Sequence, residues 1–178
     1  MPTLLELADR LEAAGRGFVA LEGELIARGP WPLAADFGTG PEASWGPPEV
    51  LAHVGEMLPY WLGEMERVVE APAGSDPVPF GRVSDDPVRL AIIGRDRTVP
   101  LRELLARVSA DARRVAARFR QLATEGADAR AGLHPRLGEM ALPAIAERFL
   151  TTHATEHVAQ LREILDAGAA SGEGARDR

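Results

Sequence analysis

The chain contains the stretch Thr151-Thr152-His153-Ala154-Thr155-Glu156-His157-Val158-Ala159-Gln160-Leu161, which decides the fold that we expect. His153 and His157 lie four residues apart, so in a helix their imidazoles project from one face, one turn apart. The inward stripe of this helix advances in steps of three and four residues, through Ala146, Leu150, His153, His157, Gln160 and Ile164. Burying a polar group without a partner costs roughly 1–3 kcal/mol. A bound metal ion is the simplest compensation for so many polar groups on an inward stripe.

The same spacing of apolar residues predicts three further long helices, at residues 3–27, from residue 47 to about residue 70, and at residues 101–124. The histidine helix is expected at residues 143–167. Four such helices predict an all-α fold, a four-helix bundle with long connecting loops. We expect residues 1–167 to form one domain, followed by a disordered tail at residues 168–178 that is rich in Gly, Ala and Ser.

The second helix supplies a third histidine on its inward stripe. Gly46 is expected to be its N-cap and Pro47 its first residue, where proline loses no hydrogen bond. His53 follows about two turns later at a position where leucine is typical, which makes it a candidate ligand beside His153 and His157. Pro59 removes one helical hydrogen bond and predicts a kink after His53.

The connecting segments are predicted to be irregular. Residues 29–46 are dense in Pro and Gly but carry Trp31, Phe37 and Trp45, so we expect this loop to pack over one end of the bundle. Prolines interrupt residues 71–100, where only residues 90–93 favour a short turn or strand. Residues 126–140 are predicted to form a second loop.

The composition excludes several classes of function. The 178 residues contain no cysteine, so any thiol in the chemistry must come from another molecule. The net charge of −7 argues against nucleic acid as a partner. No apolar run approaches the roughly 20 residues that span a bilayer, and residues 1–4 lead into an amphipathic helix without a secretory signal. We therefore expect a cytoplasmic protein with a small-molecule substrate and no membrane partner.

Three histidines from two helices are typical of metal sites that keep one coordination position open. Such an ion can lower the pKa of a coordinated water or thiol. His134 lies in a loop and is excluded from the predicted ligand set. Gln160, one turn beyond His157, is predicted to orient a ligand or to bond to a loop carbonyl.

Two short motifs admit other interpretations. The run from His153 to His157 fits the H-x-x-E-H pattern of inverted zinc peptidases, in which Glu156 would be the general base. Too little sequence follows to supply the further ligand of that class, so we interpret Glu156 as a flanking residue that can still assist proton transfer. Arg95-Asp96-Arg97 could attract an anionic substrate, although short charged runs are usually solvated surface.

Three segments in order resemble the DinB-like superfamily of four-helix-bundle metalloenzymes. They are Trp45-Gly46-Pro47-Pro48-Glu49-Val50-Leu51-Ala52-His53, then His134-Pro135-Arg136-Leu137-Gly138-Glu139-Met140-Ala141-Leu142, and the stretch His153 to Leu161. This superfamily includes thiol-dependent S-transferases and maleylpyruvate isomerases that use mycothiol or bacillithiol. The resemblance implies that His53, His153 and His157 bind one divalent metal, zinc or nickel, and that members pair as homodimers with stress-linked expression.

Three hypotheses of function remain open at this point. The leading one is a metal-dependent enzyme that activates a low-molecular-weight thiol, as an S-transferase, or water, as a hydrolase. The alternative is a non-catalytic stress protein that binds a metal or a small molecule without turnover. The third is a purely structural bundle in which the histidines bind no metal.

Overall fold

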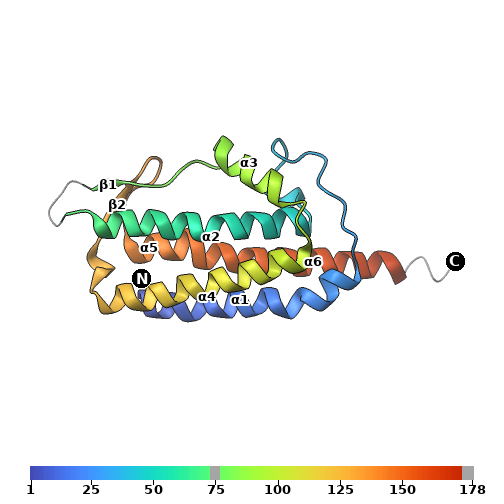
Figure 1. Ribbon diagram of the computed structural model, residues 1–178, viewed down its shortest axis with the longest axis horizontal. Helices are drawn as coiled ribbons and strands as arrows, with labels where there is room; N and C mark the ends of the chain where they lie inside the picture. Colours follow the sequence, from blue (N-terminus) through green and yellow to red (C-terminus); the bar gives the residue numbers. More distant parts are fainter. Residues whose placement is uncertain (73–76, 174–178) are drawn as a thin grey trace.

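The computed structural model describes residues 1–72 and 77–173, and these are mostly helical. The long helices are α1 (Leu4–Ala27), α2 (Pro47–Glu70), α4 (Leu101–Thr124) and α6 (His153–Glu173), the last preceded by α5 (Leu142–Ala146) and a π-helical segment, η3 (Glu147–Thr152). They lie along a common axis (Figure 1). Helix α1 packs against α4 and α6, and α2 packs against the same two helices, so each of the four long helices contacts two of the others. Among the described residues, no helix combines the length and the hydropathy that crossing a bilayer requires.

Local sequence signals account for where these helices start. Thr3 caps α1 through a capping box with Glu6, in which each side chain bonds to the backbone of the other residue. Gly46 is the N-cap of α2 and Pro47 its first residue, as predicted. Helix α2 continues through Pro59 to Glu70. The predicted bounds of 101–124 coincide with α4.

One continuous apolar core lies between the long helices, with Phe18 of α1 and Phe119 of α4 fully buried in it. The 29–46 segment joins this core through Trp45, which is buried and contacts the ring of His53 edge-on. A short 3-10 helix, η1 (Glu42–Ser44), immediately precedes Trp45. Packing of Trp45 therefore brings η1 close to the start of α2.

Two connecting segments are more regular than the sequence predicted. Residues 126–140, predicted as a loop, contain β2 (Ala131–His134) and the start of β3 (Gly138–Ala141), which form an antiparallel hairpin. β1 (Val78–Pro79) pairs with β2 in parallel. The turn or strand predicted at residues 90–93 is wrong, because these residues belong to helix α3 (Pro87–Asp96). Asp86 caps α3 by accepting from the backbone N–H of Arg89 at 2.8 Å, with proline as the first residue.

The predicted end of the last helix at residue 167 was too early. α6 continues through Gly168 to Glu173, so the first part of the predicted disordered tail is helical. The 168–173 run contains no proline to break the helix, and its two alanines are the best helix formers, so the two glycines lower its helix propensity without ending the helix. The rest of that predicted tail, residues 174–178, lies outside the described residues.

The small sheet fixes the segment that follows β1. The backbone N–H of Phe80 donates to the carbonyl of Leu133 at 3.1 Å, which extends the pairing with β2. Gly81 follows with φ of 85°, and a Cβ at this position would lie 2.6 Å from Cδ2 of His134. Only glycine satisfies both conditions without strain. The chain therefore leaves the sheet close to α2, and the next residues, Arg82 to Ser84, line a cavity described below.

Candidate metal centre

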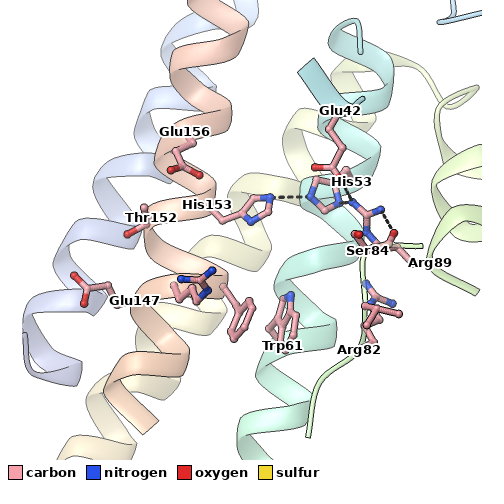
Figure 2. Close-up of a pocket in the computed structure, with 13 residues that line it drawn as sticks. Glu42, His53, Trp61, Arg82, Ser84, Arg89, Glu147, Thr152, His153 and Glu156 are labelled. Carbon is pink, nitrogen blue, oxygen red and sulfur yellow. Dashed lines mark hydrogen bonds and ion pairs between the residues drawn. The ribbon is translucent and has the colours of Figure 1, made fainter. Parts of the chain in front are cut away.

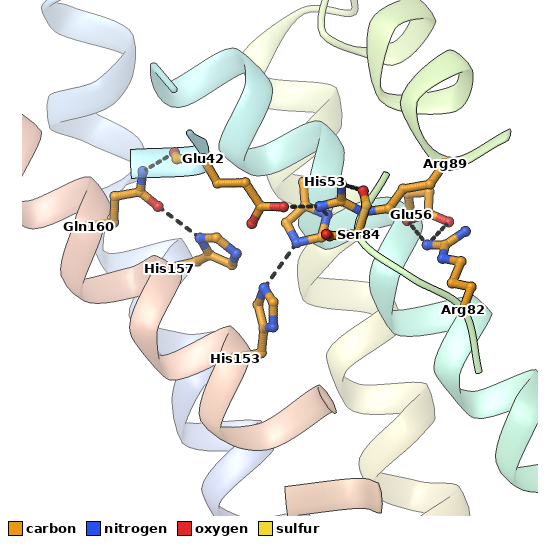
Figure 3. Close-up of polar contacts among 9 residues, drawn as sticks. All are labelled: Glu42, His53, Glu56, Arg82, Ser84, Arg89, His153, His157 and Gln160. Atoms are coloured by element: carbon orange, nitrogen blue, oxygen red, sulfur yellow. Dashed lines mark hydrogen bonds and ion pairs between the residues drawn. The ribbon is translucent and has the colours of Figure 1, made fainter. Parts of the chain in front are cut away.

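Three histidines and one glutamate come together between α2, α6 and η1 (Figure 3). His53 lies in the second turn of α2, His153 and His157 in the first two turns of α6, and Glu42 begins η1. One potential ligand atom from each of the four residues lies within 4.8 Å of all the others. The Nε2 atoms of His53 and His153 are 3.0 Å apart. Residues separated by a hundred positions in the chain thus form one cluster.

The three imidazoles are held in their neutral form. Burial lowers the pKa of His53 well below its ordinary value, and the neighbouring His157 and Arg89 lower it further. Burial, with smaller contributions from His157 and Arg89, lowers the pKa of His153 to about 3. The pKa of His157 is also lowered, mainly by burial. Neutral imidazole is the form that binds metal, so protons compete weakly for these nitrogens near neutral pH.

Gln160 orients His157, in the role predicted from the sequence. Its Oε1 lies 2.9 Å from Nδ1 of His157, and its Nε2 donates to the backbone carbonyl of Glu42 at 3.0 Å. An amide oxygen can only accept, so Nδ1 of His157 carries the proton and Nε2 keeps its lone pair. That Nε2 is buried and has no hydrogen-bond partner among the described residues. The donor set therefore fits a divalent ion, which would satisfy this lone pair.

The Gln160→Leu variant is expected to bind zinc roughly 10- to 100-fold more weakly than the wild type, as is typical when the hydrogen bond that orients a ligand is lost. Leucine keeps the approximate volume but removes both bonds of the amide. Competition against a chromophoric zinc chelator measures the affinity. Gln121→Leu, an equivalent change on the exposed face of α4, is the matched control. Equal zinc affinities for the two variants would contradict an orienting role for Gln160.

A buried arginine from α3 completes the surroundings of the cluster. Arg89 pairs with the carboxylate of Glu42, and its Nη1 donates to the carbonyl of Ser84 at 2.9 Å. Its Nη2 lies 3.3 Å from Nδ1 of His53. A guanidinium only donates, so this contact assigns the lone pair of His53 to Nδ1 and the proton to Nε2. Ligation of a metal by Nε2 of His53 requires the other tautomer and therefore the release of this Arg89 contact.

The π-helical segment η3 ends directly before His153. The sequence predicted uninterrupted α-helix here. A π-helix forms i→i+5 hydrogen bonds and holds more residues per turn than an α-helix, so side chains beyond it are rotated relative to those before it. Phe149, Thr152 and His153 all line the cavity beside the cluster. Single π-helical turns within α-helices are frequent at functional sites.

This cavity has a volume of about 570 Å³ and opens beside His53 and His153 (Figure 2). Aromatic, cationic and acidic side chains line it, among them Trp61, Phe149, Arg82, Arg89 and Glu156. Its volume lies within the range of small-molecule sites, roughly 300–1,000 Å³. A small molecule in this cavity would therefore contact the histidine cluster.

Two other residues considered from the sequence lie outside the ligand cluster. His134, which the sequence excluded from the ligand set, is not part of the cluster. It is buried in a group of aromatic rings and stacks on Phe149 and Trp61. Glu156 lines the cavity next to His153 and is exposed.

The Arg95-Asp96-Arg97 run does not line the cavity beside the histidines. Asp96 is buried and pairs with Arg95 at 2.6 Å and with Arg107 of α4 at 2.8 Å. Arg97 pairs at 3.1 Å with Glu49, which is fully buried in α2. These charges attach α3 and its C-terminal turn to α2 and α4, so we interpret the run as structural.

Sequence reasoning missed Glu42, Arg89 and Arg82. Glu42 lies in a segment that the sequence identified only as a long loop with three aromatics. Arg89 and Arg82 belong to the region predicted as irregular. The Asp86-Pro87 pair is a helix-start signal that could have revealed α3 and, with it, the fixed position of Arg89.

Comparison with known proteins does not identify a relative: no protein-family profile matches the chain, and neither curated proteins nor solved structures give a match.

Proposed function

We propose that the chain binds one divalent metal ion, zinc or nickel, through His53, His153 and His157. Glu42 is a candidate fourth ligand, in competition with its ion pair to Arg89. The observation that carries the proposal is the approach of four ligand atoms to within 4.8 Å, together with the unpartnered buried Nε2 of His157. We further propose that the four long helical segments form a four-helix bundle of the DinB-like kind, in which each helix supplies part of a shared core.

We propose that this centre is enzymatic and that it activates a low-molecular-weight thiol or water, as an S-transferase or a hydrolase. A divalent ion in the site would supply Lewis acidity that favours the deprotonated form of a coordinated thiol or water. The thiol would be a cosubstrate, because the chain has no cysteine. Two features of the chain support turnover: the cavity beside His153 has room for a substrate, and Glu156 lines it with an exposed carboxylate that can accept or return a proton.

The test begins with elemental analysis of protein purified without chelators, before and after supply of zinc or nickel. About one metal per chain is expected. The loaded and chelator-stripped proteins are then compared for consumption of N-acetylcysteine with a nitroaryl halide, and for hydrolysis of 4-nitrophenyl acetate. We expect one of the two rates to exceed that of the stripped protein at least about a hundredfold, the low end of what a positioned acid or base contributes.

The other outcomes are informative as well. Bound metal without turnover on either substrate panel would favour a non-catalytic binding protein. Absence of metal after supply of both ions would overturn the proposal and leave the histidine cluster as a structural element.

A further inference from the structure

The cavity beside the histidine cluster carries balanced charges of its own. Three arginines and three glutamates line it, so its lining is neutral overall: Arg82, Arg89, Arg148, Glu42, Glu147 and Glu156. A divalent ion bound by neutral histidines would add two positive charges to this lining. The loaded cavity would then favour an anionic occupant.

The charged side chains of the cavity differ in whether an ion pair within the protein already engages them. Arg89 pairs with Glu42, and Glu147 pairs with Arg10 of α1 at 3.2 Å. Arg148, by contrast, has no carboxylate within ion-pair distance among the described residues, although it is exposed and lines the cavity. Its guanidinium is therefore free to accept an anionic ligand.

Arg82 lines the same cavity, but its charge is neutralised within the protein. One guanidinium nitrogen, Nη2, holds both oxygens of Glu56, at 2.6 and 2.5 Å. The side chain is nine-tenths buried, and its Nε has no hydrogen-bond partner among the described residues. Because this Nε has no accessible surface, it does not face the cavity, and Arg82 belongs to the cavity wall without binding the anion.

Two aromatic side chains also line this cavity. Trp61 of α2 and Phe149 of η3 stack with ring centroids 4.0 Å apart and planes 11° from parallel. The guanidinium of Arg148 lies 5.9 Å from the centroid of Phe149. In Figure 2, Trp61 and Arg82 both lie below His153. The cavity thus offers one unpaired guanidinium, aromatic side chains and imidazole nitrogens to one occupant.

We propose that this cavity binds a small molecule in which a carboxylate is attached to an apolar group. Arg148 receives the carboxylate, and the apolar group packs against Trp61 and Phe149. This inference rests on the proposed function in that it concerns the same site. The arginine and aromatic side chains would bind the carboxylate compound without any metal.

Isothermal titration calorimetry with benzoate and its neutral isostere benzamide tests the proposal. Both the chelator-stripped and the zinc-loaded proteins are titrated, because the stripped protein excludes direct binding of the carboxylate to an ion. We expect benzoate to bind at least about tenfold more tightly than benzamide in both forms, since charge-assisted hydrogen bonds are roughly twice as strong as neutral ones. Arg148→Gln should remove most of this preference, because it lowers the affinity for benzoate far more than the affinity for benzamide.

Arg162→Gln is the matched control, because Arg162 is also an exposed arginine of the last helical segment but does not line the cavity. Thermal unfolding of both variants checks that each is folded. Equal affinities for benzoate and benzamide, or no binding of either compound, would overturn the proposal. A preference for benzoate that appears only with zinc and survives Arg148→Gln would also overturn it, since the ion itself would then hold the carboxylate. Conversely, a protein that binds no metal but still prefers benzoate to benzamide would support this carboxylate site. That result would refute only the proposed metal centre.

Discussion

The His53→Ala and His153→Ala variants are each expected to bind zinc about a hundredfold or more weakly than the wild type. Complete four-ligand zinc sites bind with roughly 10–16 kcal/mol, so one ligand contributes about 3 kcal/mol, which corresponds to about two orders of magnitude. Each alanine also removes one of the two Nε2 atoms that lie 3.0 Å apart. Competition with a chromophoric chelator gives the affinity, and elemental analysis gives the zinc bound per chain.

His134→Gln serves as the control for this prediction, because it also removes a buried histidine but lies outside the cluster. Its zinc affinity is expected to equal that of the wild type, even if its unfolding midpoint falls. If His134→Gln lost as much affinity as His53→Ala, the loss would reflect the stability of the fold rather than ligation. An unchanged affinity in His53→Ala would remove His53 from the ligand set.

The Glu56→Ala variant is expected to lose about 3–5 kcal/mol of free energy of unfolding, the typical cost of leaving one member of a buried ion pair without its partner. The side chains of Glu56 and Arg82 are only 4% and 10% exposed. Arg82 also lies over the ring of Tyr60, with its guanidinium carbon 3.7 Å from the centroid, so it cannot reach solvent without losing this contact. Urea unfolding followed by circular dichroism measures the change.

Two further variants separate the cost of an unpaired charge from other losses. Replacing both members, Glu56→Met with Arg82→Met, removes the buried charges together and is expected to recover most of the lost stability. Asp111→Ala breaks an exposed pair with Arg114 on α4 and is expected to cost about 1 kcal/mol or less. A double variant as unstable as Glu56→Ala would show that lost packing, rather than an unpaired arginine, causes the loss of free energy of unfolding.

The long helices were predictable from the sequence because their signals are local. Apolar residues at three- and four-residue spacing define the inward face, and caps such as Thr3 and Gly46 define where α1 and α2 begin. The same periodicity placed His53, His153 and His157 on inward faces. It could not show the interruption by η3, since a π-helical turn changes the rotation of the helix without changing the apolar composition of the sequence.

The short elements were not predictable in the same way. The β2–β3 hairpin has strands of four residues, too short for an alternating pattern to stand out from a loop. It is stabilised by pairing with β1, which comes from a distant part of the chain. The hairpin affects the cavity because His134 lies against Gly81, the residue before the segment that lines the cavity. Neither residue belongs to a sequence pattern that predicts a position near the histidine cluster.

By itself the sequence determined the long helices, their caps and the inward placement of three histidines, because each depends on residues within a few turns of one another. Only the tertiary structure decided that Glu42 and Arg89 join this cluster, and that Arg82 and Trp61 line the cavity beside it. The Arg89–Glu42 pair spans 47 positions and the His53–His153 approach spans 100. Such contacts depend on how distant segments of the chain pack over a shared core, and packing depends on shape and burial along the whole chain rather than on any local pattern.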